Sequence, residues 1–214
     1  EFNYSAINNF AVREARGEYL LFLNNDVEII TENWLEEMLQ LCQQKDVGMV
    51  GAKLYYPDDT IQHAGVVVGL GGVAAHVLCK LPRDAEGYMG RLRCVQEISA
   101  VTAACMMVKT SVFKAVGGFD EELKVAFNDI DLCMKVRKYG VKIVFTPYAE
   151  LYHYESKSRG MEDTPEKQLR FSREVNCFRR KWERELLKGD PYYNPNLTLN
   201  NTDCSLRKQE KNGD

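Results

Sequence analysis

Apolar and polar positions follow two different periods along the chain, and these periods predict alternating helices and strands. Residues 19–23 and 47–55 are apolar runs of strand length, whereas residues 3–15 and 31–42 repeat apolar side chains at helical spacing. Apolar strands that alternate with amphipathic helices predict an α/β fold with a mainly parallel sheet flanked by helices. The pattern predicts strands at residues 19–23, 47–55, 98–108 and 141–145, and helices at residues 3–15, 31–42, 110–116, 128–139 and 165–187.

Residues that commonly begin or end helices mark the boundaries of these elements. Thr31, Thr110 and Asn128 each stand where an N-cap is expected, and Gly140 stands where the helix from Asn128 ends. Thr164 precedes a proline and a glutamate, which together form a strong signal for the start of the last helix.

Two segments lack a regular pattern. Residues 57–90 break into short β-like pieces separated by glycines, which predicts an irregular insertion or flexible loops. Residues 191–214 are rich in Asn and Pro and hold too few apolar side chains to fold alone. We therefore predict one domain over residues 1–190 and a polar tail over residues 191–214.

The composition excludes two classes of partner. The 214 residues carry 28 Lys and Arg against 31 Asp and Glu, so there is no excess of positive charge to neutralise nucleic acid. The longest apolar stretches, residues 64–78 and 98–108, fall short of the ~20 residues that a membrane-spanning helix needs. Seven cysteines, an odd number without a CxxC pair, favour a reduced chain in the cytoplasm.

Asp26 directly follows the apolar run at residues 19–23, at the kind of position where open α/β sheets bind ligands. Together with Glu28 it offers hard oxygen ligands that suit Mg²⁺ or Mn²⁺ holding a diphosphate. The sequence Asn24-Asn25-Asp26 is also ordinary turn chemistry after a strand. Both interpretations stay open on these residues alone.

Asp129 and Asp131 fall in the first turn of the helix predicted at residues 128–139. Acids at that place are explained by capping and by the helix dipole, which stabilises negative charge there by ~0.3–1 kcal/mol. A carboxylate fixed at a helix start can also take a proton from an incoming hydroxyl, which is the role of a general base. The spacing by itself favours capping.

His153 is the histidine with the most suggestive neighbours. A lone histidine is usually a satisfied polar residue of the core, but Lys157 and Arg159 follow it in a loop suited to phosphate oxygens. His63 and His76 have no such company in the irregular region, and we assign them no role.

Taken in order, these segments resemble the family 2 glycosyltransferases, which are inverting enzymes of the GT-A fold that use nucleotide sugars. Residues 15–26 (ARGEYLLFLNND) are similar to the family's strand leading into its DxD element. Residues 103–109 (AACMMVK) lead into residues 117–121 (GGFDE), and residues 128–135 (NDIDLCMK) resemble the ED-x-DLC-x-R segment. With His153 the resemblance covers roughly residues 2–190, and the ordered set is far more specific than any one motif.

The resemblance implies a metal and donor site. Asp26 matches the metal-binding Asp of the DxD element, where it would hold Mg²⁺ or Mn²⁺ on the donor's diphosphate. His153 matches a position that is a further metal ligand in some relatives. Asn24 replaces the first Asp of the element and so removes one anionic ligand. The donor-binding residues implied in this way are Asn24, Asn25, Lys157 and Arg159.

The resemblance also implies a catalytic base. Asp129 matches the residue that deprotonates the acceptor hydroxyl as it attacks the anomeric carbon. Asn128 stands where the family usually has Glu, so only the second acid of that pair is kept. Asp131 is expected to support the site by capping the helix or orienting its neighbours.

The implied activity is transfer of a single sugar from a nucleoside-diphosphate sugar to an acceptor hydroxyl, in glycan or cell-surface polysaccharide synthesis. The acceptor would be a saccharide or a lipid-linked or protein acceptor, met in the cytoplasm or peripherally at the inner membrane face. Single addition is expected because residues 178–182 (FRRKW) depart from the QxxRW element of processive synthases. The family's first βαβ unit, which binds the nucleobase, does not precede Asn3, so we expect an N-terminally truncated domain.

Two other classes of function compete with this one. The first is a catalytically incomplete fragment or a non-enzymatic scaffold, in which the helix at residues 165–187 and the tail carry a homo-oligomer or another partner. The second is nucleotidyl transfer, which normally needs a Gly-rich phosphate loop near the N-terminus, and none is visible in the sequence.

Overall fold

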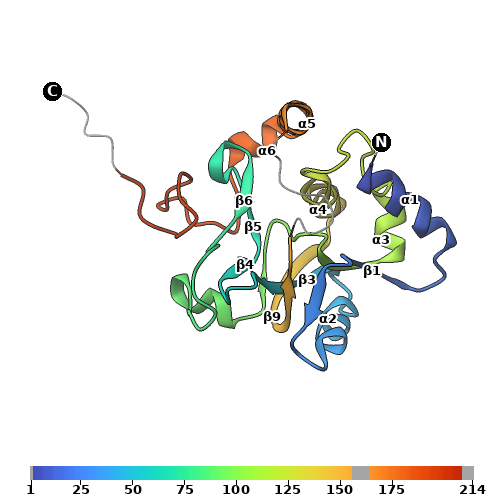
Figure 1. The fold of residues 1–214 in the computed structure, drawn as a ribbon, viewed down its shortest axis with the longest axis horizontal. Coiled ribbons are helices and arrows are strands. Elements are labelled where there is room, and N and C mark those ends of the chain that lie inside the picture. Colours follow the sequence, from blue (N-terminus) through green and yellow to red (C-terminus); the bar gives the residue numbers. More distant parts are fainter. Residues whose placement is uncertain (1, 156–163, 209–214) are drawn as a thin grey trace.

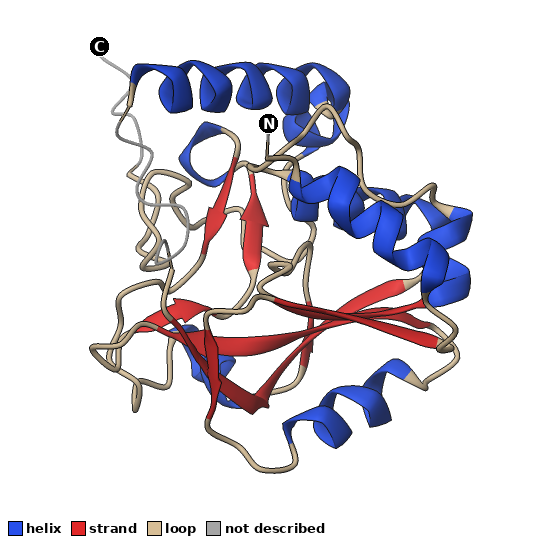
Figure 2. Cartoon of the chain, turned by 45° about the vertical axis from the view of Figure 1, so that its right-hand side comes forward, coloured by secondary structure: helices blue, strands red, loops and turns tan. Residues whose placement is uncertain are grey.

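A mixed sheet with helices on both faces organises the protein (Figures 1 and 2). The structure, a computed structural model, describes residues 2–155 and 164–208. Its helices are α1 (Tyr4–Glu14), α2 (Trp34–Cys42), α3 (Thr110–Ala115), α4 (Asn128–Tyr139), α5 (Pro165–Lys181) and α6 (Glu183–Lys188), with short 3₁₀ turns at Leu70–Gly72 and Tyr88–Arg93. Its strands are β1 (Tyr19–Leu23), β2 (Val27–Ile29), β3 (Val47–Tyr55), β4 (Ile61–His63), β5 (Val66–Val68), β6 (Ala74–His76), β7 (Gln96–Glu97), β8 (Cys105–Lys109) and β9 (Lys142–His153).

The main sheet has the strand order β1-β8-β3-β9-β2, with β4 beside β3 and β7 beside β9. The predicted α/β class is confirmed. Among the described strands, however, only β3 and β9 pair in parallel, and the other pairs of this sheet are antiparallel. An apolar run indicates that both faces of a strand are covered. Antiparallel strands between two helical layers are covered on both faces as well, so apolar runs do not reveal strand direction. The expectation of a mainly parallel sheet is therefore wrong.

Alternate side chains of the central strands supply two separate cores. Met49 and Met106 pack with α1, α3 and α4 on one face, while Val50 and Met107 pack with α2 on the other. Figure 1 shows α2 on one side of the sheet and α1, α3 and α4 opposite it. The two-residue period of a strand thus explains why these runs are apolar without interruption.

Two strands differ in length from the prediction. β9 continues past Pro147 to His153, because a register shift against β3 between Gly51 and Lys53 accommodates the extra residues. β8 begins only at Cys105, and residues 98–104 form a loop instead of a strand. Both differences matter for function, since they place the end of β9 and this loop beside the end of β1.

Three residues that were expected to cap helices have other positions or other hydrogen-bond partners in the structure. Thr31 precedes the start of α2, and its hydroxyl accepts the amide of Glu150 at 3.2 Å. Thr110 is the first residue of α3 and donates its hydroxyl to the carbonyl of Gly17 at 2.7 Å. Asn128 is the first residue of α4, with Phe127 at the cap in a left-handed conformation. The start signal at Thr164 is correct, because its hydroxyl accepts the amide of Lys167.

The described part of the polar tail packs on the body of the protein. Tyr193, Leu197 and Cys204 are buried in the same core as β5 and β6. Asp190 accepts the amide of Val68 at 2.8 Å, which ties the start of the segment to β5. No helix among the described residues has the length and apolar character needed to cross a membrane.

Candidate metal and transfer site

Asn24, Asp26 and His153 meet where β1 ends and where β2 pairs with β9. The register of that pair sets Val27 opposite His153, and the amide of Tyr154 donates to the carbonyl of Asp26 at 2.8 Å. His153 Nε2 lies 3.2 Å from Asp26 Oδ1 and 3.1 Å from Asn24 Nδ2. The side chains of Asp26 and His153 are only 13% and 10% exposed, so their interaction is poorly screened by water.

Gln62 in β4 fixes the ring of His153. Gln62 Nε2 donates to the carbonyl of His153 at 3.2 Å, and Gln62 Oε1 lies 2.7 Å from His153 Nδ1. With the amide held in this orientation, Nδ1 must carry a proton and donate it to Oε1. Nε2 is therefore left with a lone pair, which lies within reach of the Asn24 Nδ2 donor and beside Asp26 Oδ1.

This donor set fits a divalent cation. Asp26 Oδ1 is buried and accepts no hydrogen bond from any described residue. It lies 3.2 Å from His153 Nε2, and a cation bound between these two atoms would be attracted by both of them. The described residues include no group of three or more His, Cys, Asp or Glu placed to bind a metal. A cation here would complete its shell with Asn24, water or phosphate oxygens, as Mg²⁺ commonly does.

We refer to Asn24, Asp26 and His153 as the metal corner. The loop at residues 98–104 connects this metal corner to α4. Three consecutive residues of the loop each make a backbone hydrogen bond to a different element. The bonds are Thr102 amide to His63 Nε2 (3.4 Å), Ala103 amide to Asp129 Oδ2 (3.1 Å) and Asn24 amide to the Ala104 carbonyl (3.0 Å). Asp129 is thus held one residue away, along this loop, from the strand end that carries Asn24 and Asp26.

Asp129 is oriented by two backbone amides. Its Oδ2 accepts the amide of Ala103 at 3.1 Å, and its Oδ1 accepts the amide of Ile130 at 2.8 Å. Each carboxylate oxygen keeps one lone pair for a further donor. The neighbouring Tyr4 donates to the Ala103 carbonyl, and burial together with the charge of Asp129 raises the pKa of Tyr4.

The two polar neighbours of Asp129 in α4 are bonded to partners of their own. Asn128 is buried and bonds within its own turn, to the carbonyl of Val125 and the amide of Asp129. Asp131 is fully buried and accepts Trp182 Nε1 at 2.8 Å and Lys181 Nζ at 2.8 Å. Asp131 therefore joins α4 to the end of α5.

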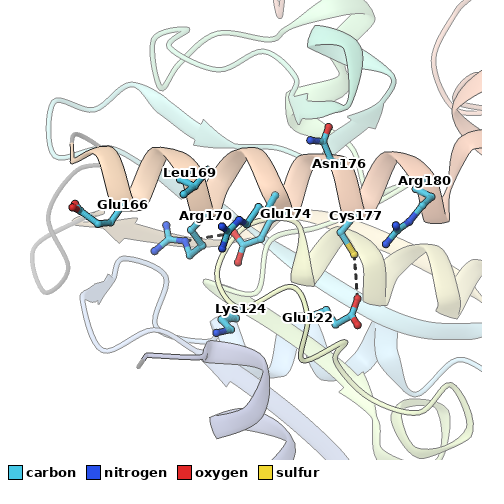
Figure 3. Close-up of a pocket in the computed structure, with 10 residues that line it drawn as sticks. Glu122, Lys124, Glu166, Leu169, Arg170, Glu174, Asn176, Cys177 and Arg180 are labelled. Carbon is cyan, nitrogen blue, oxygen red and sulfur yellow. Dashed lines mark hydrogen bonds and ion pairs between the residues drawn. The ribbon is translucent and has the colours of Figure 1, made fainter.

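Helix α5 also supports the loop that leads into α4. Glu174 is buried, and its two carboxylate oxygens accept the amides of Val125 and Ala126, both at 3.0 Å. Figure 3 shows Glu174 on α5 beside a hollow that Lys124 also lines. This hollow of about 670 Å³ is larger than the one beside His153, but it lies on the α5 side of the loop and none of the expected site residues lines it.

A smaller cavity of about 320 Å³ adjoins the metal corner. Its polar lining comes from segments far apart in the sequence and includes residues that the sequence analysis left without a role. Among the lining residues are Gln62, His76, Thr102, His153, Glu155 and Thr202. The cavity thus lies between β4, β6, the end of β9 and the C-terminal segment.

The structure says less about the remaining residues that were expected at the site. Asn25 is exposed in the turn between β1 and β2. Lys157 and Arg159 lie outside the described residues. Sequence reasoning missed Gln62 and His76, because the segment from 57 to 90 carries no periodic pattern. The signal that could have drawn attention is that His63 and His76 stand at or near the two ends of the apolar stretch at residues 64–78.

Two curated proteins are similar in sequence to nearly the whole chain. A curated protein of Sinorhizobium fredii, "Uncharacterized protein y4gI", is 58% identical over 206 residues. The "O-antigen biosynthesis protein RfbC" of Myxococcus xanthus is 42% identical over 214 residues. These alignments cover 96% and 100% of the chain but only 23% and 16% of the relatives, so the chain spans less than a quarter of their length.

Two solved glycosyltransferase structures share the fold. The mannosyltransferase PcManGT of Pyrobaculum calidifontis, in complex with GDP-Man and Mn²⁺, superposes with a TM-score of 0.54 at 16% identity, covering 84% of the chain and 43% of that protein. GalNAc-T7 with UDP, GalNAc and Mn²⁺ superposes with a TM-score of 0.61 at 13% identity, covering 86% and 36%. The expected GT-A-like fold is therefore confirmed. Residues 2–174 match the family described as "Glycosyltransferase like family", and the chain belongs to it.

Proposed function

We propose that this chain carries the transfer site of a metal-assisted, inverting glycosyltransferase that adds a single sugar in glycan or cell-surface polysaccharide synthesis. The donor is a nucleoside-diphosphate sugar, and the acceptor is a hydroxyl of a saccharide, a lipid-linked glycan or a protein. One observation carries the proposal. The Asp129 carboxylate is bonded to Ala103, and Asn24, which lies beside the Asp26 and His153 pair, is bonded to the next residue of the same loop, Ala104.

Asp26 and His153, with Asn24 beside them, would hold Mg²⁺ or Mn²⁺. The cation would supply charge neutralisation for the departing diphosphate. The chain's own part is to keep the Asp26 carboxylate and the His153 lone pair 3.2 Å apart and shielded from water, with Gln62 holding the ring. Lys157 and Arg159 are proposed to contact the diphosphate oxygens after the end of β9.

Asp129 would act as the general base. Two amides fix its carboxylate, and a free lone pair can accept the proton of the acceptor hydroxyl as that oxygen attacks the anomeric carbon. The bond that forms joins the acceptor oxygen to the anomeric carbon, and the bond that breaks joins that carbon to the diphosphate. Asn128 and Asp131 would support the base by shaping the helix start and by anchoring α4 to α5.

The proposal is tested by calorimetry and by product release. UDP-, GDP- and dTDP-linked hexoses are titrated with and without Mn²⁺, and release of nucleoside diphosphate is followed for the parent, Asp26→Asn and Asp129→Asn. We expect Asp26→Asn to lose metal-dependent binding. We expect Asp129→Asn to bind normally and to lose about 10²- to 10⁴-fold in rate.

Glu28→Gln is the matched control, because Glu28 lies two residues from Asp26 but bonds outward to Tyr154. It should behave like the parent. Equal turnover by Asp129→Asn and the parent contradicts the role of Asp129 as the general base. A stable oligomer that binds none of these nucleotides, with or without Mn²⁺, favours the scaffold interpretation instead.

A further inference from the structure

His63, which is buried, and His76, which is half-buried, form a pair beside the proposed transfer site. Their Nδ1 atoms lie 3.1 Å apart, and their rings meet edge to face with centroids 4.9 Å apart. His63 is fully buried in β4, and His76 ends β6 and lines the cavity of about 320 Å³. The pair has no place in the metal-ligand set described above.

The hydrogen bonds order the protons of the pair. The amide of Thr102 donates to His63 Nε2, which must therefore be a proton acceptor. A neutral His63 then carries its proton on Nδ1 and donates it to His76 Nδ1. His76 is left with its own proton on Nε2.

Both rings are held neutral near pH 7. Burial lowers the pKa of His63 well below its usual value, and the neighbouring His76 adds to the effect. Burial also lowers the pKa of His76, although the charges of Asp129 and Glu155 and the carbonyl of Gln62 act in the opposite direction. A neutral imidazole with a fixed N–H is a directional donor that suits a hydroxyl oxygen.

The position of His76 relates this donor to the proposed reaction. It shares the cavity lining with the metal-ligand candidate His153, and it lies close enough to Asp129 for their charges to interact. The same cavity presents Thr102 and Thr202, whose side chains can both donate and accept. Several neutral hydrogen-bonding groups around a small cavity are suited to a ring that carries hydroxyls.

We propose that this cavity binds a sugar ring and that His76, oriented by His63, donates a hydrogen bond from Nε2 to one of its hydroxyls. The inference rests on the proposed glycosyl transfer and names the residue that selects its sugar. The hydroxyl belongs either to the donor sugar or to the acceptor, and the experiment distinguishes the two. His63 is a positioning residue, since it acts only through His76.

The first measurement is the ring protonation of the three histidines, read by ¹⁵N–¹H NMR at pH 7.5 and assigned with single His→Gln variants. We expect His63 to carry its proton on Nδ1 and His76 on Nε2. The protein is then titrated with Mg²⁺ and UDP-, GDP- and dTDP-linked hexoses, with the free nucleotides and with simple methyl glycosides. A His76 response to a nucleotide sugar but not to its free nucleotide assigns the donor, and a response to a methyl glycoside assigns the acceptor.

The second measurement compares His76→Leu with His76→Gln. The leucine variant should weaken binding of the responding sugar by about 3- to 10-fold, as expected for one neutral hydrogen bond, and leave Mg²⁺ affinity unchanged. The glutamine variant keeps an N–H donor and should restore most of the affinity. A purely structural role would not separate the two variants in this way.

Two results overturn the inference and differ in what else they imply. The role of His76 is refuted if its proton lies on Nδ1. It is also refuted if the NMR signals of the His76 ring do not change while the Asn24 amide signal responds to the sugar. Neither result contradicts the proposed transfer site. If no nucleotide sugar moves any signal with Mg²⁺ present, the proposed function fails, and the role of His76 fails with it.

Discussion

Replacing Asp131 by Asn should destabilise the fold and leave nucleotide binding by the folded protein intact. The Asp131 carboxylate is fully buried, accepts Trp182 Nε1 and Lys181 Nζ at 2.8 Å each, and lies 3.3 Å from Lys135 Nζ. The amide of Asn keeps the shape and one acceptor oxygen, so the bond to Trp182 can survive. Both lysines, however, lose the negative charge that they share between α4 and α5.

The size of the effect follows from the burial of the partners. Removing one member of a buried ion pair costs about 3–5 kcal/mol. The Lys181 side chain is 33% exposed and keeps Asp120, and the Lys135 side chain is 19% exposed and keeps the carbonyl of Gly118, so the lower end applies. At about 3 kcal/mol, and with a urea m-value of about 3 kcal/mol/M, the unfolding midpoint should fall by roughly 1 M.

The assay is urea unfolding followed by tryptophan fluorescence and far-ultraviolet circular dichroism. Trp182 reports directly on the contact, and coincident transitions by the two probes support two-state analysis. Glu183→Gln, an exposed acid next to Trp182, is the control and should shift stability by less than about 0.5 kcal/mol. A midpoint for Asp131→Asn within about 0.2 M of the parent, against the expected shift, refutes the reasoning, as does loss of nucleotide binding by the folded variant.

Three further predictions follow from other contacts. Gln62→Leu removes the acceptor that fixes His153 and should weaken Mn²⁺ binding by about 10- to 100-fold in calorimetry, whereas unchanged affinity would show that the ring needs no support. Gly51→Ala would bring a Cβ into a clash with Cγ1 of Val101 and should lower the thermal midpoint measurably, and an unshifted midpoint contradicts that clash. Burial raises the pKa of Asp120, but the hydrogen bonds from Lys181 and from the amide of Glu122, together with the charges of Lys181 and Lys135, outweigh burial and lower it. Its contribution to stability is therefore complete above the unfolded pKa of about 3.9 and lost as pH falls through the folded value, so Asp120→Asn and the parent should converge in stability at acid pH in urea titrations.

Local pattern was enough to predict most of the elements. The helices that became α1, α4 and α5 carry their apolar stripes and boundary residues within one segment, and Gly140 ends α4 at a positive φ as expected. Strand direction was beyond such reasoning. The direction in which β8 enters the sheet depends on the path of the chain after residue 57, and no periodicity records that path. Thr31 shows the same limit, since a distant amide on β9 takes the hydroxyl that was expected to cap α2.

The residues of the candidate site could likewise be predicted from the sequence only in part. Asp26, Asp129 and His153 could be singled out because they sit in ordered motifs at the ends of predicted elements. Gln62 and His76 could not, because their importance arises only when β4 pairs with β3 and β6 folds back on β5. Thr202 reaches the cavity from a segment that the composition marked as a polar tail.

The geometry of the site depends mainly on backbone atoms of one loop. The amides of Thr102 and Ala103 and the carbonyl of Ala104 bind a histidine, the proposed base and the strand end that bears Asn24. Side chains at these three positions can therefore change without breaking the bonds. A shift of the loop backbone, by contrast, displaces all three partners together, because bonds from consecutive residues cannot be corrected separately. The proposed metal ligands, the proposed base and the histidine pair are thus linked through one loop, and a substitution that moves the loop should impair the proposed metal binding, sugar binding and transfer in parallel.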